Sequence, residues 1–359
     1  MWLSSQEIKE KYVSKGTYTI TKKAVDDNTT KMVKAGTPLI VSRSGILARL
    51  FPISIPTTDV AINQDIKALI FDLNIINTNF FVAQLKKNED FILRSIVKTG
   101  TTVQSINMPD FYKLQLSFPS MNEQEKVGKF FQRLDDTIAL HQQKQRQIRS
   151  LKQGFIKNLF PNNKNSAPRI RFSIFNDDWN QRNASEIFTS VSDKNYPELP
   201  VLSASQEKGM VLRESNGIDI KYDQKSTGTY KRVLPGQFVM HLRSFQGGFA
   251  YSTIEGITSP AYTILAFRNK EDHYPLFWKS IFSSKNFIKR LEAITYGIRD
   301  GRSISYADFS TLRFWIPSYE EQKQIGDFIE SIDATIAFYQ RQIDMMQSLK
   351  KELLNKMFI

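Results

Sequence analysis

Basic side chains are the most abundant chemically functional groups in the sequence. The 359 residues include 49 Lys and Arg but only 36 Asp and Glu, so the formal net charge is +13. A surplus of this size favours a polyanionic partner, most often nucleic acid and less often an anionic membrane. A protein can also carry such a charge for solubility alone, and composition leaves both interpretations open.

The basic residues are most concentrated between residues 137 and 176, where no acidic residue occurs. A run of this kind is typical of a surface that follows a phosphate backbone. The alternative is one solvated helix face followed by a linker. The basic residues of the run are Lys144, Arg146, Arg149, Lys152, Lys157, Lys164, Arg169 and Arg171.

Individual basic residues are candidates for contacts with DNA. Arginine suits base recognition because its planar guanidinium can donate two hydrogen bonds to guanine, whereas lysine usually positions a protein on phosphates. The candidates are Arg43, Arg243, Arg299, Arg302, Lys221, Lys225, Tyr230, Lys231 and Arg232, with Lys144 and Arg149 from the basic run. For each of them, a solvated surface position is an equally good interpretation.

Residues typical of catalysis or metal binding are scarce. There is no Cys, and the three His residues are far apart, so neither a thiolate site nor a His-rich metal site is expected. The GxxxxGK(S/T) loop, the GxSxG elbow and the Asn/Asp-Pro-Pro-aromatic tetrad of adenine methyltransferases are all absent. The acidic pairs Asp135-Asp136 and Asp177-Asp178 are interpreted as a helix cap and a turn. We therefore expect no catalytic residue and no metal, although nuclease folds can lack a strong motif.

The apolar content is sufficient for folded domains. Hydrophobic residues make up 41% of the chain, and its length corresponds to about two domains of ~150 residues each. No run of 18 apolar residues occurs, and the N-terminal residues lack the pattern of a signal peptide. We expect two domains or more and no membrane span.

The sequence contains a long internal repeat. The segment that begins at Asp110 aligns without a gap to the segment that begins at Asp308, and 18 of the 51 aligned positions are identical. Chance would give about three identities. A weaker match continues upstream at an offset of 200, where Gly36 aligns with Gly236 and Arg43-Ser44 with Arg243-Ser244. The chain is therefore two copies of one unit, each a variable region followed by a helical region.

The repeat predicts four segments. We expect a first recognition region at 1–109, a first helical region at 110–161, a second recognition region at 162–307 and a second helical region at 308–359. The second copy starts near Pro168, and the first copy has no counterpart of about residues 168–201. We expect either that the first region is shortened at its N-terminus or that the natural chain starts upstream of Met1.

Each helical region predicts a long amphipathic helix. Ser120 and Glu123 fit a capping box, and Asp135-Asp136 predicts a second cap, before a helix of about 25 residues that is ~37 Å long, near one turn of B-DNA. Steps of three and four predict an a/d-like seam of apolar residues. The two copies can pair within the chain as an antiparallel coiled coil, although two separate helices that each pack on their own domain are the alternative. The seam residues are Ile138, Ile148, Leu151, Phe155 and Leu159, with Ile336, Ile343, Met346, Leu349, Leu353 and Met357; the polar His141 and Gln145 would set the register.

The recognition regions combine short β-rich runs with one helix each. Strands are predicted within 37–44, 67–73, 236–244, 262–268 and 314–318, and helices at 276–294 and about 77–97. The fold class is therefore α+β, with two pseudo-repeated α/β recognition domains separated by two long helices.

This layout resembles the specificity subunit of type I restriction-modification enzymes, the HsdS family. Pro168-Arg169-Ile170-Arg171-Phe172 and Trp179 also look like the usual start of a second recognition domain in that family. The resemblance covers nearly the whole chain. It is carried by Pro119, Glu123-Gln124, Gly128, Phe130, Leu134-Asp135, Ile138, Leu151-Lys152 and Phe160, and by Pro317, Glu321-Gln322, Ile325-Gly326, Phe328, Ile332-Asp333, Ile336, Leu349-Lys350 and Met357-Phe358.

The resemblance implies a cytoplasmic, non-catalytic reader of double-stranded DNA. Each recognition domain would read one half of a split target, and the helix pair would hold the two at a fixed separation. The family's subunit binds two methyltransferase (modification) subunits that carry S-adenosylmethionine, and restriction subunits add ATP and Mg²⁺, so this chain itself would bind no cofactor. The alternatives are a protein-interaction scaffold, a stand-alone DNA-binding protein, and a nuclease or methyltransferase that acts alone.

Overall fold

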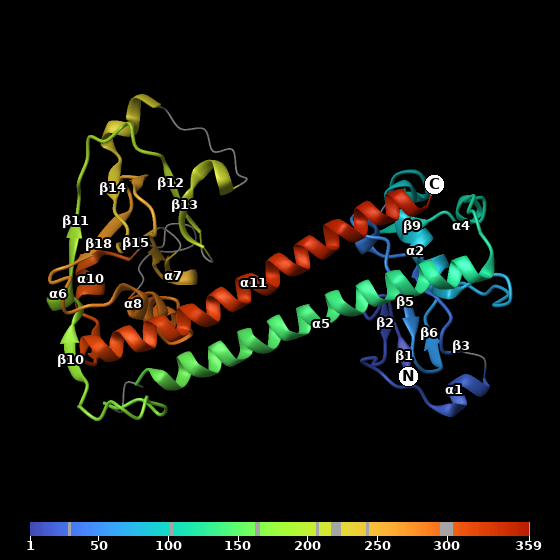
Figure 1. The fold of residues 1–359 in the computed structure, drawn as a ribbon, viewed down its shortest axis with the longest axis horizontal. Coiled ribbons are helices and arrows are strands. Elements are labelled where there is room, and N and C mark those ends of the chain that lie inside the picture. Colours follow the sequence, from blue (N-terminus) through green and yellow to red (C-terminus); the bar gives the residue numbers. More distant parts are fainter. Residues whose placement is uncertain are drawn as a thin grey trace. The chain divides into compact units, whose positions relative to one another are not determined.

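The computed structural model describes residues 1–27, 30–100, 103–161, 166–205, 208–216, 224–241, 244–294 and 304–358. These residues form two compact units. Unit 1 comprises Met1–Lys144 and Tyr339–Ile359, and unit 2 comprises Gln145–Phe338. Each unit combines one α/β region with part of both long helices (Figure 1).

Short strands and helices form the α/β region of unit 1. Two apolar cores fill it, one around Phe51 and Leu85 and the other around Leu3 and Val60. The sheets have the orders β2-β5-β4-β7, β1-β6-β3 and β8-β9. The strands are β1 Trp2–Leu3, β2 Tyr12–Val13, β3 Lys31–Val33, β4 Leu39–Val41, β5 Ile53–Pro56, β6 Val60–Ile62, β7 Ile66–Ala68, β8 Val97–Thr99 and β9 Gln104–Ile106. The helices are α1 Lys22–Asp26, η1 Gly45–Ala48, α2 Thr78–Lys87, α3 Glu89–Phe91, η2 Ile92–Ile96 and α4 Met108–Phe111.

The α/β region of unit 2 has a core rich in aromatic rings, among them Trp278, Phe188 and Phe282. Its largest sheet is antiparallel, with the order β11-β18-β15-β16. The other strand pairs are β10-β19, β12-β13 and β14-β17. The strands are β10 Asn180–Asn183, β11 Phe188–Val191, β12 Leu202–Ser205, β13 Gly209–Leu212, β14 Lys231–Val233, β15 Phe238–Met240, β16 Ala250–Tyr251, β17 Gly256–Thr258, β18 Thr263–Phe267 and β19 Arg313–Ile316. The helices are α6 Ala184–Ile187, η3 Arg213–Asn216, η4 Gln224–Thr229, α7 Ser244–Gly247, α8 Pro275–Phe282, α9 Lys285–Ala293 and α10 Tyr306–Ser310.

Four of the five predicted strand runs contain a strand, but the run at 67–73 is wrong beyond its first two residues, because β7 ends at Ala68. Both predicted helices of the recognition regions are interrupted. The expected helix at 276–294 is two helices, because Ser283 ends α8 and the hydroxyl of Ser284 caps α9 by accepting from the N–H of Phe287. The expected helix at about 77–97 is α2, α3 and the π-helical turn η2. Hydroxyl caps of this kind compete with helix continuation.

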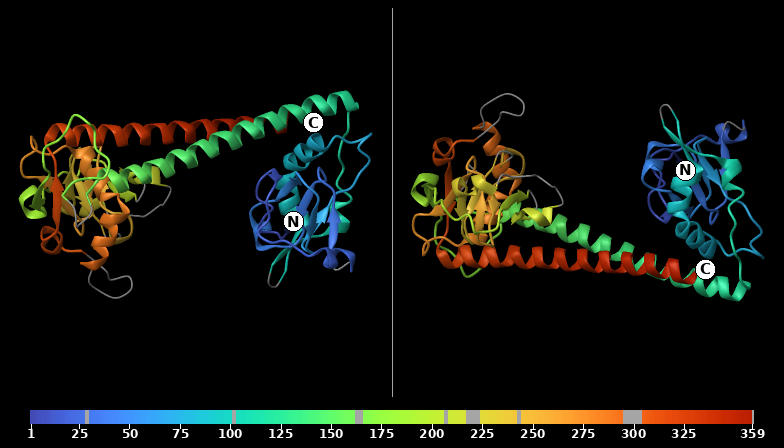
Figure 2. Two further views of the ribbon diagram at one scale, coloured as in Figure 1. Left: turned by 90° about the horizontal axis from the view of Figure 1, so that it is seen from below. Right: turned by 90° about the horizontal axis from the view of Figure 1, so that it is seen from above.

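The two helical regions each form one continuous helix of 39 residues, α5 Met121–Leu159 and α11 Tyr319–Met357. At 1.5 Å per residue each is about 58 Å long, so the expectation of a second cap at Asp135 and a helix of ~37 Å is wrong. Asp135 faces Lys11 and Lys350 instead of capping a helix. Within each unit, the segments of α5 and α11 run antiparallel and lie side by side (Figures 1 and 2), and ion pairs join them.

The seam between α5 and α11 differs from the predicted one at three positions. Leu151, Leu349 and Met357 are exposed, with 60%, 46% and 42% of their surface open, so their assignment to the seam is wrong. Lys152 and Lys350 are half-buried one residue further along and face carboxylates of the other helix. Because one residue turns a helix by about 100°, the preceding leucines point outward. Ile138, Leu159, Ile336 and Ile343 are buried, and Ile148, Phe155, Met346 and Leu353 are half-buried.

Candidate nucleic-acid interface

Each α/β region is fastened to a long helix by a buried glutamine at equivalent positions of the repeat. The side-chain amide of Gln124 donates to the carbonyls of Ile75 and Pro119, at 3.0 and 2.9 Å, and its oxygen accepts from the N–H of Asn77 at 3.0 Å. Asn77 is the N-cap of α2. Gln124 is only 2% exposed, so it satisfies buried backbone groups that water cannot reach.

Gln322 repeats this arrangement in unit 2. Its amide donates to the carbonyls of Asp272 and Pro317, at 3.0 and 3.2 Å, and its oxygen accepts from the N–H of Tyr274 at 3.1 Å. Tyr274 is the N-cap of α8. The two copies therefore place their helices α2 and α8 on α5 and α11 through the same set of contacts.

A glycine one turn after each glutamine lets these helices approach closely. A Cβ on Gly128 would lie 2.8 Å from the backbone N of Phe80, and a Cβ on Gly326 would lie 2.8 Å from the backbone N of Phe277. Real Cβ atoms do not approach backbone so closely. The glycine pair is thus a packing requirement, repeated with the glutamines.

Ion pairs between the long helices are also repeated. In unit 2, the ammonium of Lys152 lies 2.5 and 2.6 Å from the two carboxylate oxygens of Asp333. In unit 1, Lys350 pairs with Asp135, which also lies 3.0 Å from the ammonium of Lys11. Burial lowers the pKa of Lys11, and the charge of Asp135 opposes this change. Polar pairs at seam positions favour one register and one orientation of paired helices.

Two predicted register residues lie in the seam. The buried side-chain amide of Gln145 donates to the carbonyl of Ile336 at 3.2 Å. The ring of His141 packs edge-on against Tyr339, with 5.4 Å between centroids. The positions of both agree with a role in register, and neither belongs to a metal site among the described residues.

A salt bridge attaches the start of the second recognition region to α11. The guanidinium of Arg171 contacts both carboxylate oxygens of Glu321, at 2.8 and 2.7 Å, and donates to the carbonyl of Asp177 at 2.6 Å. Glu321 is only 1% exposed. Glu123, its counterpart in the first copy, is exposed. Arg171 and Lys152 therefore have intramolecular roles that the basic run did not reveal.

Most of the predicted DNA contacts in unit 2 either lie outside the described residues or are engaged within the fold. Arg232 lies between Asp193 and Glu255, at 3.4 and 2.5 Å, and its guanidinium stacks on the ring of Tyr196. The hydrogen bond to Glu255 raises the pKa of Arg232. The ammonium of Lys231 donates to the carbonyl of Tyr262 at 2.7 Å, and Tyr230 is half-buried. Arg243, Arg299, Arg302 and Lys221, and the side chain of Lys225, lie outside the described residues.

Three of the predicted contacts have exposed side chains. Arg43 follows β4, and its backbone forms a bridge with Ser105. Lys144 and Arg149 lie on α5, and Arg149 also lines a cavity of unit 2. The contact of all eleven predicted residues with DNA stays a prediction.

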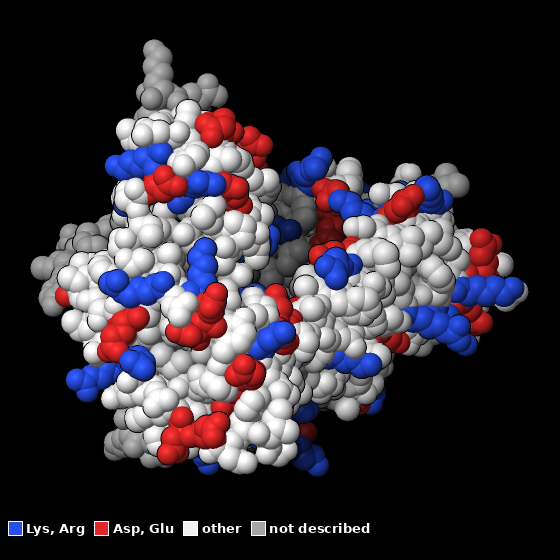
Figure 3. Space-filling view, turned by 60° about the vertical axis from the view of Figure 1, so that its left-hand side comes forward, with Lys and Arg blue, Asp and Glu red and all other residues white. Residues whose placement is uncertain are grey.

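The surface charge is mixed on the face drawn in Figure 3. On the face drawn in Figure 3, basic and acidic side chains alternate, and no patch of one sign covers this face. None of the helices within the described ranges combines the length and hydropathy that a bilayer crossing requires.

The sequence is similar to known proteins of one family. Residues 3–150 match the family model described as the type I restriction modification DNA specificity domain. This match covers less than half of the chain, which in that part is similar to type I restriction-modification specificity subunits. Over 134 residues it is 29% identical to the EcoR124I/EcoR124II specificity subunit of Escherichia coli. That alignment covers 37% of this chain and 33% of the relative, so the chain matches about a third of the relative's length.

Solved structures from type I restriction-modification systems share the fold of this chain. The S subunit of a type I restriction-modification system from M. genitalium superposes with a TM-score of 0.59 over 99% of this chain and 91% of that chain, at 15% identity. A chain from a study of complex assembly and conformational transition of the type I R-M system has a TM-score of 0.50 over 91% of this chain and 83% of that chain, at 14% identity. At such identities the likeness concerns the fold, which is two α/β domains and an antiparallel helix pair.

Proposed function

We propose that the chain reads a split DNA target, with each α/β region recognising one half-site. The observation that carries this proposal is the duplicated attachment of the two regions. Gln124 and Gln322 make equivalent hydrogen bonds, each at the start of one helix of an α/β region, α2 or α8. Two similar readers on one antiparallel helix pair suit a target with two separate parts.

We further propose that two copies of one methyltransferase subunit bind the outer faces of α5 and α11. The repeat leaves apolar side chains exposed at equivalent positions: Leu140 and Phe338 are 48% and 49% exposed, and Leu151 and Leu349 are 60% and 46% exposed. Exposed apolar side chains that form a contiguous patch are typical of protein interaction sites. A surface that occurs twice would take two similar partners.

Catalysis belongs to the partners in this proposal. The methyltransferase subunits would supply S-adenosylmethionine, and the restriction subunits would supply ATP and Mg²⁺. This chain would choose the DNA sequence at which they act. The mixed charge of the face in Figure 3 favours one competing candidate, a scaffold that binds proteins and not DNA.

The salt dependence of DNA binding separates the reader from the scaffold. The chain is co-produced with its methyltransferase, and the affinity for target and scrambled duplexes is measured by fluorescence anisotropy at 50 and 200 mM salt. A reader that makes 6–10 phosphate contacts loses roughly 10³–10⁵-fold in affinity between these concentrations and prefers the target at both. Equal, weak binding of the two duplexes that does not change with salt would support the scaffold.

A further inference from the structure

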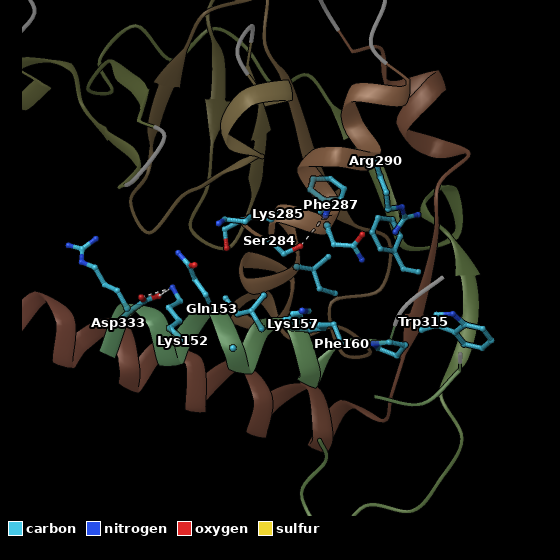
Figure 4. Close-up of a pocket in the computed structure, with 18 of the residues that line it drawn as sticks. Lys152, Gln153, Lys157, Phe160, Ser284, Lys285, Phe287, Arg290, Trp315 and Asp333 are labelled. Carbon is cyan, nitrogen blue, oxygen red and sulfur yellow. Dashed lines mark hydrogen bonds and ion pairs between the residues drawn. The ribbon is translucent and has the colours of Figure 1, made fainter. Parts of the chain in front are cut away.

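Unit 2 contains a cavity of about 770 Å³ to which the proposed function assigns no role. It lies between the last turns of α5, the junction of α8 with α9, and β19 (Figure 4). Sites for small molecules usually have volumes of ~300–1,000 Å³. The cavity therefore has the size of a small-ligand site.

The lining of this cavity is strongly basic. The one acidic lining residue, Asp333, is paired with Lys152. The five other basic lining residues form no salt bridge with a described carboxylate. The cavity therefore has an excess of positive charge. The basic lining residues are Arg149, Lys152, Lys157, Lys285, Arg290 and Arg313.

Arg290 is the clearest case of a basic lining residue that has no carboxylate partner among the described residues. Its guanidinium lies over the ring of Phe314, 4.9 Å from the centroid, and donates to the carbonyl of Arg313 at 2.6 Å. Burial lowers the pKa of Arg290, and no carboxylate among the described residues opposes this change. A desolvated charge without a counter-ion is costly, and a bound anion would offset that cost.

The first turn of α9 adds donors at the same place. Ser284, Lys285 and Asn286 line the cavity, and Figure 4 shows Lys285 and Ser284 on the α9 side with Lys157 and Gln153 on the α5 side. The positive end of the helix dipole at this turn favours negative charge. The arrangement suits a phosphate held by lysine and arginine side chains.

Aromatic and aliphatic side chains form the remaining walls. Phe160, Phe287 and Trp315 line the cavity with Ile156 and Ile281. These walls can cover a flat apolar ring. The lining therefore fits a ligand that joins a ring to a phosphate.

The first copy does not repeat this lining. The counterparts of Arg149 and Lys157 are the uncharged Gln347 and Asn355. The counterpart of Ile156 is Leu354, which is buried in a cluster with Phe80 and Phe131. The basic cavity is therefore a property of the second copy and not of the repeated unit.

We propose that the cavity binds a small phosphate ester with a flat ring, such as a nucleoside monophosphate. The ligand is distinct from the S-adenosylmethionine, ATP and Mg²⁺ assigned to the partner subunits. The proposal does not depend on how the chain reads DNA, because the cavity is built from side chains outside the repeated attachment.

Isothermal titration of AMP into the full-length chain, in complex with its methyltransferase, tests the proposal. The double variant Lys157→Gln/Lys285→Gln removes two exposed cations of the cavity. The control Lys126→Gln/Lys129→Gln removes two exposed cations of α5 outside it. We expect AMP to bind once per chain, adenosine to bind at least about tenfold more weakly, and the cavity variant but not the control to lose at least about tenfold in affinity for AMP.

Two results would overturn the proposal. One is AMP binding that is absent up to millimolar concentration or equal in the two variants. The other is full displacement of AMP by a scrambled DNA duplex, with the cavity variant losing affinity for that duplex to the same degree. The second result would assign the cavity to a phosphate of the DNA backbone. Neither AMP affinity nor displacement by a scrambled duplex measures preference for a target sequence. Failure of this proposal is therefore distinguishable from failure of the proposed function.

Discussion

Glu321→Ala is expected to lower the free energy of unfolding of unit 2 by about 2–3 kcal/mol, because it leaves a largely buried arginine without its carboxylate. Glu321 is 1% exposed, and it accepts two hydrogen bonds from Arg171. This expected loss of stability lies at or below the lower end of the range for broken buried ion pairs. The reason is that Arg171 is partly exposed and keeps its hydrogen bond to the carbonyl of Asp177. Urea unfolding followed by Trp fluorescence measures the effect, since Trp179, Trp278 and Trp315 all lie in unit 2.

Glu123→Ala is the matched control, since Glu123 is the counterpart of Glu321 in the repeat and is exposed. It is expected to change stability by less than about 0.5 kcal/mol. Equal effects of the two variants would show that the salt bridge to Arg171 does not stabilise the start of the second recognition region.

Gly326→Ala is expected to destabilise unit 2 by about 1–3 kcal/mol, as overpacking of a tight contact does. The new Cβ would lie 2.8 Å from the backbone N of Phe277 and 3.0 Å from the backbone C of Leu276. Because backbone atoms of α8 cannot move aside like a flexible side chain, α8 must shift from α11. The same fluorescence measurement reports the loss.

Gly154→Ala is a control that is expected to raise stability instead of lowering it. Gly154 lies on α5, is exposed, and has nothing within 4 Å of an added Cβ. Alanine is the better helix former by roughly 0.5–1 kcal/mol, so this variant should be more stable than the original chain. A destabilising Gly154→Ala, or a neutral Gly326→Ala, would contradict the close packing of α8 on α11.

Much of the architecture follows from the repeat alone. The gapless alignment identifies Gln124 with Gln322, Gly128 with Gly326 and Asp135 with Asp333, and the structure gives each pair an equivalent contact. A sequence repeat marks such positions but not their partners. One of the two carbonyls that each glutamine binds lies about 50 residues away in the chain.

The seam shows where pattern reasoning fails. Apolar spacing favoured Leu151 and Leu349, but the structure turns Lys152 and Lys350 inward, where Asp333 and Asp135 accept them. The hydrophobic pattern of one helix does not predict that a lysine will turn inward to pair with a carboxylate on another helix. The identical Lys152/Lys350 and Asp135/Asp333 pairs were the available signal.

The predicted DNA contacts are the least determined part of the sequence interpretation. Net charge identifies basic residues but does not tell a surface arginine from one held by acids, as Arg232 is by Asp193 and Glu255. The basic run likewise contains Arg171, which serves the fold. The four segment boundaries and the contacts of Arg43, Lys144 and Arg149 with DNA stay predictions.

Determination of the methylated target tests the central claim most directly. The chain is produced with its methyltransferase in a host that lacks other DNA methylation, and modified bases are mapped by single-molecule sequencing. Two short half-sites separated by a constant number of unspecified bases are the predicted result. One uninterrupted motif, or a gap that varies between sites, would contradict the reading of DNA by two recognition domains.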